Sequence, residues 1–357
     1  MFGLFGSKGP FNAQVSPSSC SFPVKAGDNL LKAALDAGLP WPHNCRVGSC
    51  GQCRSRLVSG KIKPLNDFSY VLTREELDAG MILACQTSLR SDVEVEVPLE
   101  TGVVQQAAKS VPGVVDRWRL LTHDILEIGL RLNEPLPPWL AGQYAELTVP
   151  GVIDQPRSYS FASAPRPDEP LQINFFVRLV PGGEMSTWLH QADRSGTPVV
   201  VRGPFGSFWL RESTAPMLCV AGGSGLAPIK ALLEQVADGG FDREVTFVFG
   251  ARTARDLYCL DAIRDLEQRS DGRFRFVPVL SEEPGDSDWS GRRGLCTEYI
   301  AAAVPDVAAC DAYLCGPPGM VDSAVAVLRG QGLGEERIYF DKFLDASHMP
   351  CGRQATG

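Results

Sequence analysis

The chain has 357 residues, 44% of them hydrophobic and 21% charged, which is ordinary for a globular protein of two or three domains. Its formal net charge of −8 argues against binding to nucleic-acid phosphates. No apolar run approaches the roughly 20 residues of a membrane-spanning helix, and the N-terminal stretch lacks the basic start and cleavage site of a signal peptide. We therefore expect a cytoplasmic protein that binds neither nucleic acid nor membrane.

Residues 11–100 mix short alternating strands with one helix, and we expect them to form a first, α+β domain. Apolar residues at helical spacing predict a helix over residues 28–38, which ends on a glycine. Strict alternation of apolar and polar residues predicts a closing strand over residues 92–98. Weak periodicity followed by Pro-Gly predicts a linker over residues 100–113.

Two further domains are expected after this linker. Residues 113–211 contain short strands separated by Gly/Pro turns, which predicts an antiparallel β-barrel or sandwich. Its clearest strands are residues 114–121, 124–132, 142–149, 172–180 and 197–203. Residues 212–343 alternate strands with helices, which predicts an α/β domain with a parallel sheet. The expected strands are residues 217–223, 245–251, 274–280 and 311–316, and the expected helices are residues 227–237, 257–269 and 319–330.

Four of the eleven cysteines have a spacing that indicates a metal site. Cys45, Cys50 and Cys53 form a C-x4-C-x2-C pattern, and Cys85 follows 32 residues later. This spacing is typical of a plant-type [2Fe–2S] site, in which four thiolates bind two irons. Glycines in the same loop can supply the positive φ angles and the exposed backbone N–H groups that such a loop needs.

Three other kinds of metal or redox site fit this sequence less well. A structural zinc site would need a second C-x2-C or a pair of histidines. A Rieske centre would need two histidine ligands, and we expect His43, the one histidine near the loop, to be a surface residue. A thioredoxin-like C-x-x-C would leave Cys45 and Cys85 unexplained. The [2Fe–2S] interpretation is therefore favoured.

Two segments of the expected barrel carry residues that suit a flavin. In RSYS, which we expect to follow a strand, Arg157 is a planar cation suited to a pyrophosphate. Tyr159 offers a face for stacking on a ring system, and Ser160 can hydrogen-bond a ring nitrogen. In PGGEMSTW, residues 181–188, a double glycine precedes a helix start whose free N–H groups form an anion site. A capped helix without a ligand is the alternative for this second segment.

Two loops of the α/β domain are candidates for nucleotide binding. GGSG, residues 222–225, is expected between a buried strand and a helix, where backbone can approach a dinucleotide pyrophosphate closely. Because this is not the G-x-G-x-x-G fingerprint, a plain Rossmann dehydrogenase is disfavoured. YLCGPPGM, residues 313–320, is a second strand-end loop expected at the same edge of the sheet.

Together and in this order, these segments resemble the ferredoxin–NADP⁺ reductase superfamily. Over nearly its whole length the chain resembles reductase components of bacterial aromatic-ring dioxygenases of the benzoate-dioxygenase-reductase type. The resemblance implies a β-grasp ferredoxin domain over residues 11–100, a flavin-binding barrel over 113–211 and an NAD-binding domain over 212–343. It implies an NADH:acceptor oxidoreductase in which electrons pass from NADH to FAD, to the [2Fe–2S] cluster and on to an oxygenase component. The segments RSYSFAS and GPFGSFWLR favour a dioxygenase over a soluble di-iron monooxygenase as the partner.

The resemblance also implies roles for individual residues. The FAD contacts would come from Arg157, Ser158, Tyr159, Ser160, Phe176, Val177, Arg178, Gly183, Met185, Ser186 and Thr187. The nucleotide contacts would come from Gly222, Gly223, Ser224, Gly225, Cys315, Gly316 and Pro317. The cluster ligands would be Cys45, Cys50, Cys53 and Cys85. Ser160, Cys315 and Phe343 would line the hydride path, where Phe343 would cover the flavin; Phe340 is the second candidate, and core packing is the alternative for both.

The three cofactors fit one task. NADH delivers two electrons as a hydride and a [2Fe–2S] cluster takes one at a time, so a flavin, which does both, must lie between them. The sequence shows no mononuclear-iron, di-iron or haem ligand pattern, so we expect the final oxidation on another protein. A different class stays open: a flavin reductase with a zinc or regulatory N-terminal module.

Two groups of arginines bear on the partners of the protein. Arg46, Arg54 and Arg56 lie in or beside the cysteine loop and predict either a basic collar that docks an acidic oxygenase surface or a solvated rim. Arg252 and Arg255 follow a strand of the α/β domain and could in principle bind the 2′-phosphate of NADPH. The resemblance nevertheless favours NADH.

Overall fold

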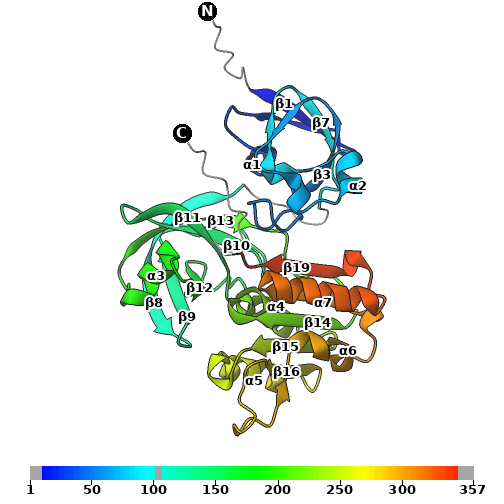
Figure 1. The fold of residues 1–357 in the computed structure, drawn as a ribbon. Helices are drawn as coiled ribbons and strands as arrows, with labels where there is room; N and C mark the ends of the chain where they lie inside the picture. The colour runs from blue at the N-terminus through cyan, green and yellow to red at the C-terminus, as the bar shows by residue number, and fades with distance from the viewer. Residues whose placement is uncertain (1–9, 101–106, 345–357) are drawn as a thin grey trace, which may run out of the picture. The chain divides into compact units, whose positions relative to one another are not determined.

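The computed structural model describes residues 10–100 and 107–344. Contacts divide the chain into two compact units, one formed by residues 1–109 with 204–207 and the other by the rest. The first unit holds a mixed sheet, and the second holds an antiparallel and a parallel sheet (Figure 1). No helix in the described part of the chain is long and apolar enough to cross a membrane.

The first unit is a β-grasp fold. Its elements are β1 (Phe11–Ser16), β2 (Cys20–Val24), α1 (Leu30–Asp36), β3 (Arg54–Ser59), β4 (Ile62–Pro64), α2 (Arg74–Asp78), β5 (Met81–Leu83), β6 (Thr87–Leu89) and β7 (Val93–Glu96). The main sheet has the order β2-β1-β7-β3-β5, in which only β1 and β7 pair in parallel. The side chain of Asn29 caps α1, which buries Leu30 and Leu31 in the same core as Trp41. The predicted helix and closing strand are therefore present as α1 and β7.

The antiparallel sheet of the second unit is curled into a barrel. Its elements are β8 (Lys109–Leu120), β9 (Ile125–Leu132), β10 (Tyr144–Val149), β11 (Ile153–Ser160), β12 (Gln172–Arg178), α3 (Glu184–Gln191) and β13 (Pro198–Phe205). The strand order is β11-β10-β13-β8-β9-β12, and an antiparallel bridge between Phe161 and Phe175 joins the two edges.

Two expectations about the barrel were wrong. The predicted linker extends to residue 113, but β8 already begins at Lys109. This strand pairs with β9 from Gly113 onward. The remainder of that linker, residues 101–106, lies outside the described residues. RSYS does not follow a strand, because residues 157–160 form the last half of β11 and pair with β10.

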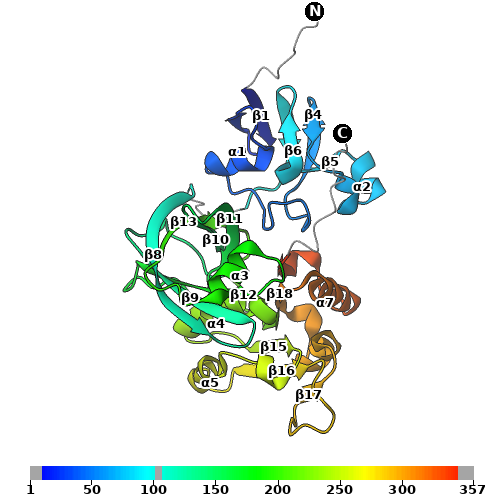
Figure 2. The same ribbon diagram turned by 60° about the vertical axis from the view of Figure 1, so that its left-hand side comes forward.

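The parallel sheet has helices on both faces. Its elements are β14 (Met217–Gly222), α4 (Leu226–Asp238), β15 (Val245–Ala251), α5 (Leu260–Arg269), β16 (Phe274–Leu280), β17 (Arg292–Arg293), α6 (Ile300–Ala303), β18 (Asp311–Gly316), α7 (Pro318–Gly330) and β19 (Ile338–Lys342). Every residue of β14 is buried: Cys219 packs with α4 and α5, whereas Leu218 packs with α6 and α7. Figure 2 shows α4 and α7 on opposite sides of β18.

The order of this sheet creates a place for a ligand. The strands follow the order β17-β16-β15-β14-β18-β19, so the chain leaves β14 toward β15 on one side, and β18 later pairs on the other side. In open parallel sheets such a reversal leaves a crevice outside the carboxyl ends of the two strands. The GGSG loop and the loop after Cys315 lie at these two carboxyl ends. One predicted helix is shorter than expected: α5 begins at Leu260, because Cys259 before it has a left-handed φ of 56°.

Candidate functional site: three cofactor cradles

The four cysteines of the predicted metal site form two pairs in the first unit. Cys45 lies beside Cys50, closely enough for the two thiols to shift each other's pKa, and Cys53 lies beside Cys85, closely enough for the Cys85 thiol to raise the pKa of Cys53. A tetrahedral zinc site, with Zn–S near 2.3 Å, would bring all four sulfurs within about 4 Å of one another. In the described part of the chain, no three of these sulfurs lie within 4.8 Å of one another. Two pairs of thiols fit two irons better than one zinc.

The backbone of the cysteine loop points toward sulfur. The N–H groups of Ser49 and Cys50 both donate to the Cys45 sulfur over 3.4 Å. The hydrogen bond from the Cys50 thiol, together with those from Ser49, lowers the pKa of Cys45 to about 5. Gly48 and Gly51 adopt φ angles of 84° and 75°, a region that other residues rarely enter. The loop thus has the donors and the backbone shape that a thiolate-bound cluster requires.

His43 is buried, which contradicts the expected surface position. Its Nδ1 lies 2.7 Å from the Trp41 carbonyl oxygen, and its Nε2 accepts the N–H of Gly206 over 3.0 Å. Burial lowers the pKa of this imidazole to about 4. Because both ring nitrogens already have backbone partners, His43 is not available as a ligand of the cluster.

The arginines near the cysteine loop do not form a free basic collar. Arg54 Nε lies 3.1 Å from a carboxylate oxygen of Glu76, and Arg56 forms an ion pair with Glu96 across β3 and β7. These exposed pairs contribute little stability, but they neutralise the charge that docking would use. Two of the three proposed collar residues are therefore paired within their own unit.

The two flavin segments of the barrel converge on one helix end. Arg157, in β11, points its guanidinium toward Glu184 in the first turn of α3, with 3.7 Å between Nη2 and Oε2. Gly183 is the N-cap of α3 and offers no side-chain cap, so the first N–H groups of the helix remain available to an anion. In the same strand Tyr159 is half-buried beside Phe175, with 6.2 Å between ring centroids. A cation, a helix N-terminus and an aromatic face thus lie together.

Several residues predicted to contact FAD have side chains that are already engaged. Met185 and Val177 pack inside the barrel core. The Ser186 hydroxyl accepts the N–H of Val180 over 3.1 Å and so closes the β12–α3 loop, while the N–H of Thr187 donates to Gly183. These residues can offer only backbone or partial contacts to a ligand. The Val177 side chain faces the barrel core, because alternate residues of a strand face opposite sides.

The other predicted FAD contacts lie on one face of β12 and at the end of β11. Phe176 faces the parallel sheet and packs edge-on against Tyr258, 5.5 Å between ring centroids. Arg178 lies on the same face, and its guanidinium is 3.9 Å from the position of a Cβ on Gly223. Ser158 is exposed, whereas Ser160, at the end of β11, is buried. Phe176 and Arg178 therefore adjoin the nucleotide loop as well as the barrel.

The two loops at the ends of β14 and β18 pack backbone against backbone. A Cβ on Gly225 would overlap the carbonyl oxygen of Cys315, and a Cβ on Gly222 would lie 2.6 Å from the Met320 sulfur. Gly225 is also the N-cap of α4 and provides no side-chain cap. The Tyr258 hydroxyl donates to the carbonyl oxygen of Gly223 over 2.9 Å and so holds the loop in place. A 3-10 turn over Gly223–Gly225 runs directly into α4, and the N–H of Leu226 donates to the Gly223 carbonyl, so the glycine loop itself is the segment that a pyrophosphate would approach.

The remaining predicted nucleotide contacts surround this cradle. Ser224 is half-buried in the loop, and Pro317 is the residue before α7. Gly316 has a φ of 149°, and a Cβ there would lie 3.0 Å from the Gly222 carbonyl oxygen. Burial raises the pKa of the Cys315 thiol well above its usual value, so this group stays neutral. The structure thus brings both predicted nucleotide loops together.

The structure separates the two aromatic candidates near the end of β19. The N–H of Phe343 donates to the Gly316 carbonyl over 2.9 Å, and the ring packs against the core cluster that contains Cys315 and Ala162. Phe340 packs against the cluster on the opposite face of the sheet. Phe343 is therefore on the same side as the end of β11 and the nucleotide loops, and Phe340 is not.

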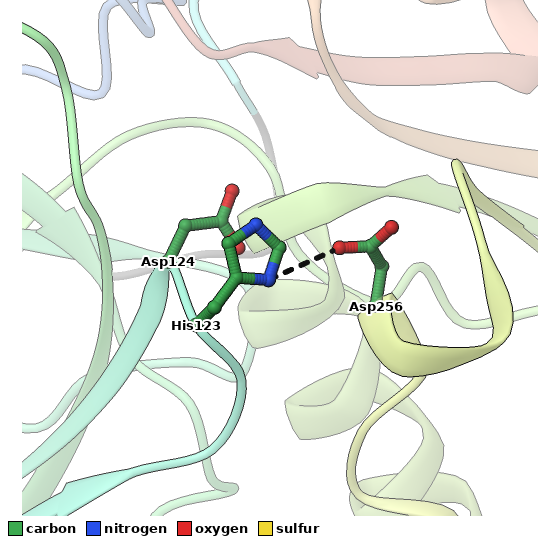
Figure 3. A group of neighbouring side chains, drawn as sticks. All are labelled: His123, Asp124 and Asp256. Atoms are coloured by element: carbon green, nitrogen blue, oxygen red, sulfur yellow. Dashed lines mark ion pairs between the residues drawn. The ribbon is translucent and has the colours of Figure 1, made fainter. Parts of the chain in front are cut away.

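Sequence reasoning missed a network of charged side chains between barrel and parallel sheet (Figure 3). Asp124 lies 3.1 Å from the Arg252 guanidinium and 3.5 Å from that of Arg178. His123 Nδ1 lies 3.4 Å from a carboxylate oxygen of Asp256, which Arg252 also approaches at 3.6 Å. His123, Asp124 and Asp256 are spaced closely enough for a metal, but both carboxylates already form ion pairs with arginines, Asp124 with Arg178 and Arg252, and Asp256 with Arg252. No local sequence motif predicts contacts between residues that lie more than 100 positions apart in the chain.

Family models match the three parts of the chain. The 2Fe-2S iron-sulfur cluster binding domain matches residues 13–90, the oxidoreductase FAD-binding domain matches residues 113–209, and the oxidoreductase NAD-binding domain matches residues 219–326. The protein is therefore an oxidoreductase that binds a [2Fe–2S] cluster, FAD and NAD.

Relatives are similar over nearly the whole chain. The xylene/toluene monooxygenase electron transfer component XylA of Pseudomonas putida is 40% identical over 351 residues, which cover 98% of this chain and 97% of the relative. The toluate 1,2-dioxygenase electron transfer component of Pseudomonas putida is 32% identical over 324 residues, 90% of this chain and 94% of the relative. The crystal structure of the Amycolatopsis cytochrome P450 reductase GcoB superposes with a TM-score of 0.82 at 33% identity, covering 93% of this chain and 98% of that one.

Fold and cofactor domains together define a ferredoxin-reductase-type flavoprotein with an N-terminal [2Fe–2S] domain. The chain belongs to the family of such reductases whose named members are electron transfer or reductase components of oxygenases.

We predict that Cys50→Ser removes the [2Fe–2S] cluster and leaves the flavin site intact. The substitution breaks one of the two thiol pairs, while Arg157 and the α3 N-terminus lie in the other compact unit. Iron and acid-labile sulfide should fall to near zero, and NADH oxidation with ferricyanide should persist. Cys20→Ser, in β2 of the same unit, is the matched control and should keep its cluster. Loss of FAD together with iron in Cys50→Ser would contradict the assignment.

We predict that Gly225→Ala weakens NADH binding selectively. The added methyl group would overlap the Cys315 carbonyl oxygen and push apart the two loops of the cradle. The KM for NADH should rise by about tenfold or more, equivalent to ~1.4 kcal/mol, with FAD and iron content unchanged. Gly330→Ala at the end of α7 is the control, because a Cβ there meets nothing within 4 Å. Unchanged NADH kinetics in Gly225→Ala would exclude this loop as the cradle.

Proposed function

We propose that this protein takes electrons from NADH and passes them singly to an oxygenase component that acts on an aromatic hydrocarbon. The observation that carries the proposal is the presence, in one chain, of two thiol pairs and two uncapped helix N-termini beside glycine loops. When bound, FAD accepts a hydride and releases electrons one at a time. The proposed domains are residues 11–100 for the cluster, 113–211 for FAD and 212–343 for the nucleotide.

The residues of the cluster domain would act as follows. Cys45 and Cys50 would bind one iron, and Cys53 and Cys85 would bind the other, since these are the pairs in contact. The N–H groups that point at the Cys45 sulfur stabilise the thiolate form and disperse its charge.

The barrel residues would bind FAD through its phosphates and its ring. Arg157 and the N–H groups at the start of α3 suit a pyrophosphate, because both supply positive charge in a fixed direction. Tyr159 would stack on the ring system, and Ser160, buried at the strand end, would hydrogen-bond it. Gly183, Met185, Ser186 and Thr187 are proposed to contribute backbone contacts; Phe176, Val177, Arg178 and Ser158 are proposed as flanking contacts.

The nucleotide would lie across the ends of β14 and β18. The backbone of the Gly222–Gly225 loop, which runs directly into α4, would bind the pyrophosphate at the positive end of that helix. The neutral Cys315 thiol, with Gly316 and Pro317, would border the nicotinamide. Phe343 would cover the flavin face until the nicotinamide displaces it. Because NADH is made and used inside the cell, we also propose a cytoplasmic location.

Two kinds of oxygenase partner remain candidates. A ring-hydroxylating dioxygenase is the first, because the toluate and naphthalene dioxygenase systems use relatives that are 32% identical. A monooxygenase is the second, because the relative that is 40% identical serves a xylene/toluene monooxygenase. Both candidates act on a substrate with an aromatic ring and need electrons one at a time.

We predict that the purified protein supports product formation by an aromatic-ring oxygenase in the presence of NADH. Oxygenase components of a toluate dioxygenase and of a xylene/toluene monooxygenase would each be reconstituted with the protein, and hydroxylated product would be measured. Wild-type protein should support one of them, and Cys50→Ser should support neither although it still oxidises NADH with ferricyanide. Equal product formation with wild type and Cys50→Ser would refute electron flow through the cluster.

We predict that kcat/KM is higher for NADH than for NADPH by about tenfold or more, equivalent to ~1.4 kcal/mol. Arg252 is already paired with Asp124 and Asp256, so it is not free for a 2′-phosphate. A Glu283 carboxylate oxygen accepts the N–H of Ala254 over 2.7 Å, which places negative charge at the end of β15. A carboxylate in this position suits ribose hydroxyls and repels a phosphate. Steady-state kinetics with NADH and with NADPH test this prediction, and a higher kcat/KM for NADPH would contradict it.

A further inference from the structure

A buried ion pair joins the barrel to the first helix of the parallel sheet. Lys230 and Glu234 lie one turn apart on α4, with 2.5 Å between Nζ and Oε1. Lys230 Nζ also donates to the carbonyl oxygen of Ala162 over 3.0 Å. The other carboxylate oxygen of Glu234 accepts the N–H of Ala164 over 3.0 Å. The pair therefore holds the barrel segment at two backbone points, and we call these four residues the clamp.

The clamp lies between the two sites that must meet during hydride transfer. On the barrel side, Ala162 follows two residues after Ser160, the last residue of β11. On the other side, Lys230 follows five residues after Gly225, where α4 begins. Ala162 and Cys315 are buried in one continuous core cluster. A shift of α4 against this segment would thus move the nucleotide loops relative to the strand that carries Tyr159.

The clamp is better protected from solvent than the other ionic contact between the same parts. The side chains of Lys230 and Glu234 are each 16% exposed. In the network around Asp124, the Arg252 side chain that crosses to the barrel is 44% exposed. Exposed pairs are screened by water and salt, whereas a buried pair that also satisfies backbone groups holds one geometry. The clamp is therefore the contact that can fix the distance between α4 and the barrel segment that follows β11.

We propose that Lys230 and Glu234 are positioning residues that set the approach of the nicotinamide to the flavin. The inference rests on the FAD and nucleotide sites proposed above and adds residues that contact neither cofactor. Hydride transfer requires reacting atoms about 3–3.5 Å apart, and a displacement near 1 Å can cost about a hundredfold in rate. A pair that locks two backbone atoms to a helix controls displacements on that scale.

The experiment compares three variants with the wild-type holoenzyme. Lys230→Met with Glu234→Met removes both charges at once and so leaves no unpaired buried ion that would unfold the protein. Glu234→Gln keeps an acceptor for the Ala164 N–H and weakens only the ion pair. The control replaces an exposed pair on α5 that touches no barrel residue, Arg264→Gln with Asp261→Asn. FAD content and thermal unfolding are recorded for each variant.

Anaerobic stopped-flow mixing with NADH gives the limiting rate of flavin bleaching and the apparent Kd for NADH. In the double methionine variant the limiting rate should fall by about tenfold or more, while the Kd changes by less than about threefold. With NADH deuterated at the transferred position, its isotope effect should exceed that of the wild type, because the chemical step becomes more limiting. Glu234→Gln should fall between this variant and the wild type, and the α5 control should match the wild type.

Other outcomes identify which idea fails. An unchanged limiting rate and isotope effect in the double variant, with FAD retained, would overturn the clamp as a positioning device. A lowered unfolding temperature with no change in rate would also overturn it and leave a structural role only. If wild-type flavin is not bleached by NADH at all, the proposed function fails instead, and the clamp cannot act in that reaction.

Discussion

The close approach of two backbones at the carboxyl ends of β14 and β18 is the constraint on which the nucleotide site depends. These neighbouring parallel strands end at the same level, and the loops after them occupy the same small space. Only glycine fits where the Gly225 α-carbon faces the Cys315 carbonyl. With side chains excluded, a ligand can approach the backbone of the loop, which forms a 3-10 turn over Gly223–Gly225 and runs directly into α4. The geometry of the sheet thus produces an anion site without any basic residue in the loop.

The same physical solution recurs in the other two cradles. In the barrel, Gly183 leaves the start of α3 uncapped, and in the β-grasp unit Gly48 and Gly51 turn the chain so that N–H groups face sulfur. All three of the groups proposed to bind there carry negative charge, and each would be met by backbone donors. This explains how a chain with a net charge of −8 can bind anionic cofactors: the positive potential is local and comes from oriented peptide groups.

The features that the sequence predicted well depend on residues that lie close together in the chain. The spacing of Cys45, Cys50 and Cys53 predicts a cluster loop, and the glycines before α4 predict a cradle, because each depends on residues close in the chain. Short strand-like segments separated by Gly/Pro turns or by helices likewise predicted most strands of both sheets of the second unit. The number and order of the domains followed from the same local signals.

The features that sequence reasoning missed are created by distant pairing. From the sequence alone, RSYS is expected to follow a strand. Pairing with β10 instead makes it the end of β11. The sequence gives no sign that Arg54 and Arg56 are paired, but the fold brings Glu76 and Glu96 beside them. The partners of Lys230 and Arg252 also come from other parts of the chain. A single sequence carries no local signal for any of these contacts.

The division of the chain into compact units follows the needs of its two kinds of transfer. A hydride moves only between atoms nearly in contact, and barrel and parallel sheet accordingly share one hydrophobic cluster, with Phe176 against Tyr258 and Ala162 beside α4. Such packing is hard to deform, because dense cores resist small shifts. A single electron needs no contact between donor and acceptor atoms, so the cluster can occupy a unit with its own core around Trp41. Rigid packing is thus concentrated where the chemistry is most sensitive to distance, and the buried clamp lies in that part of the molecule.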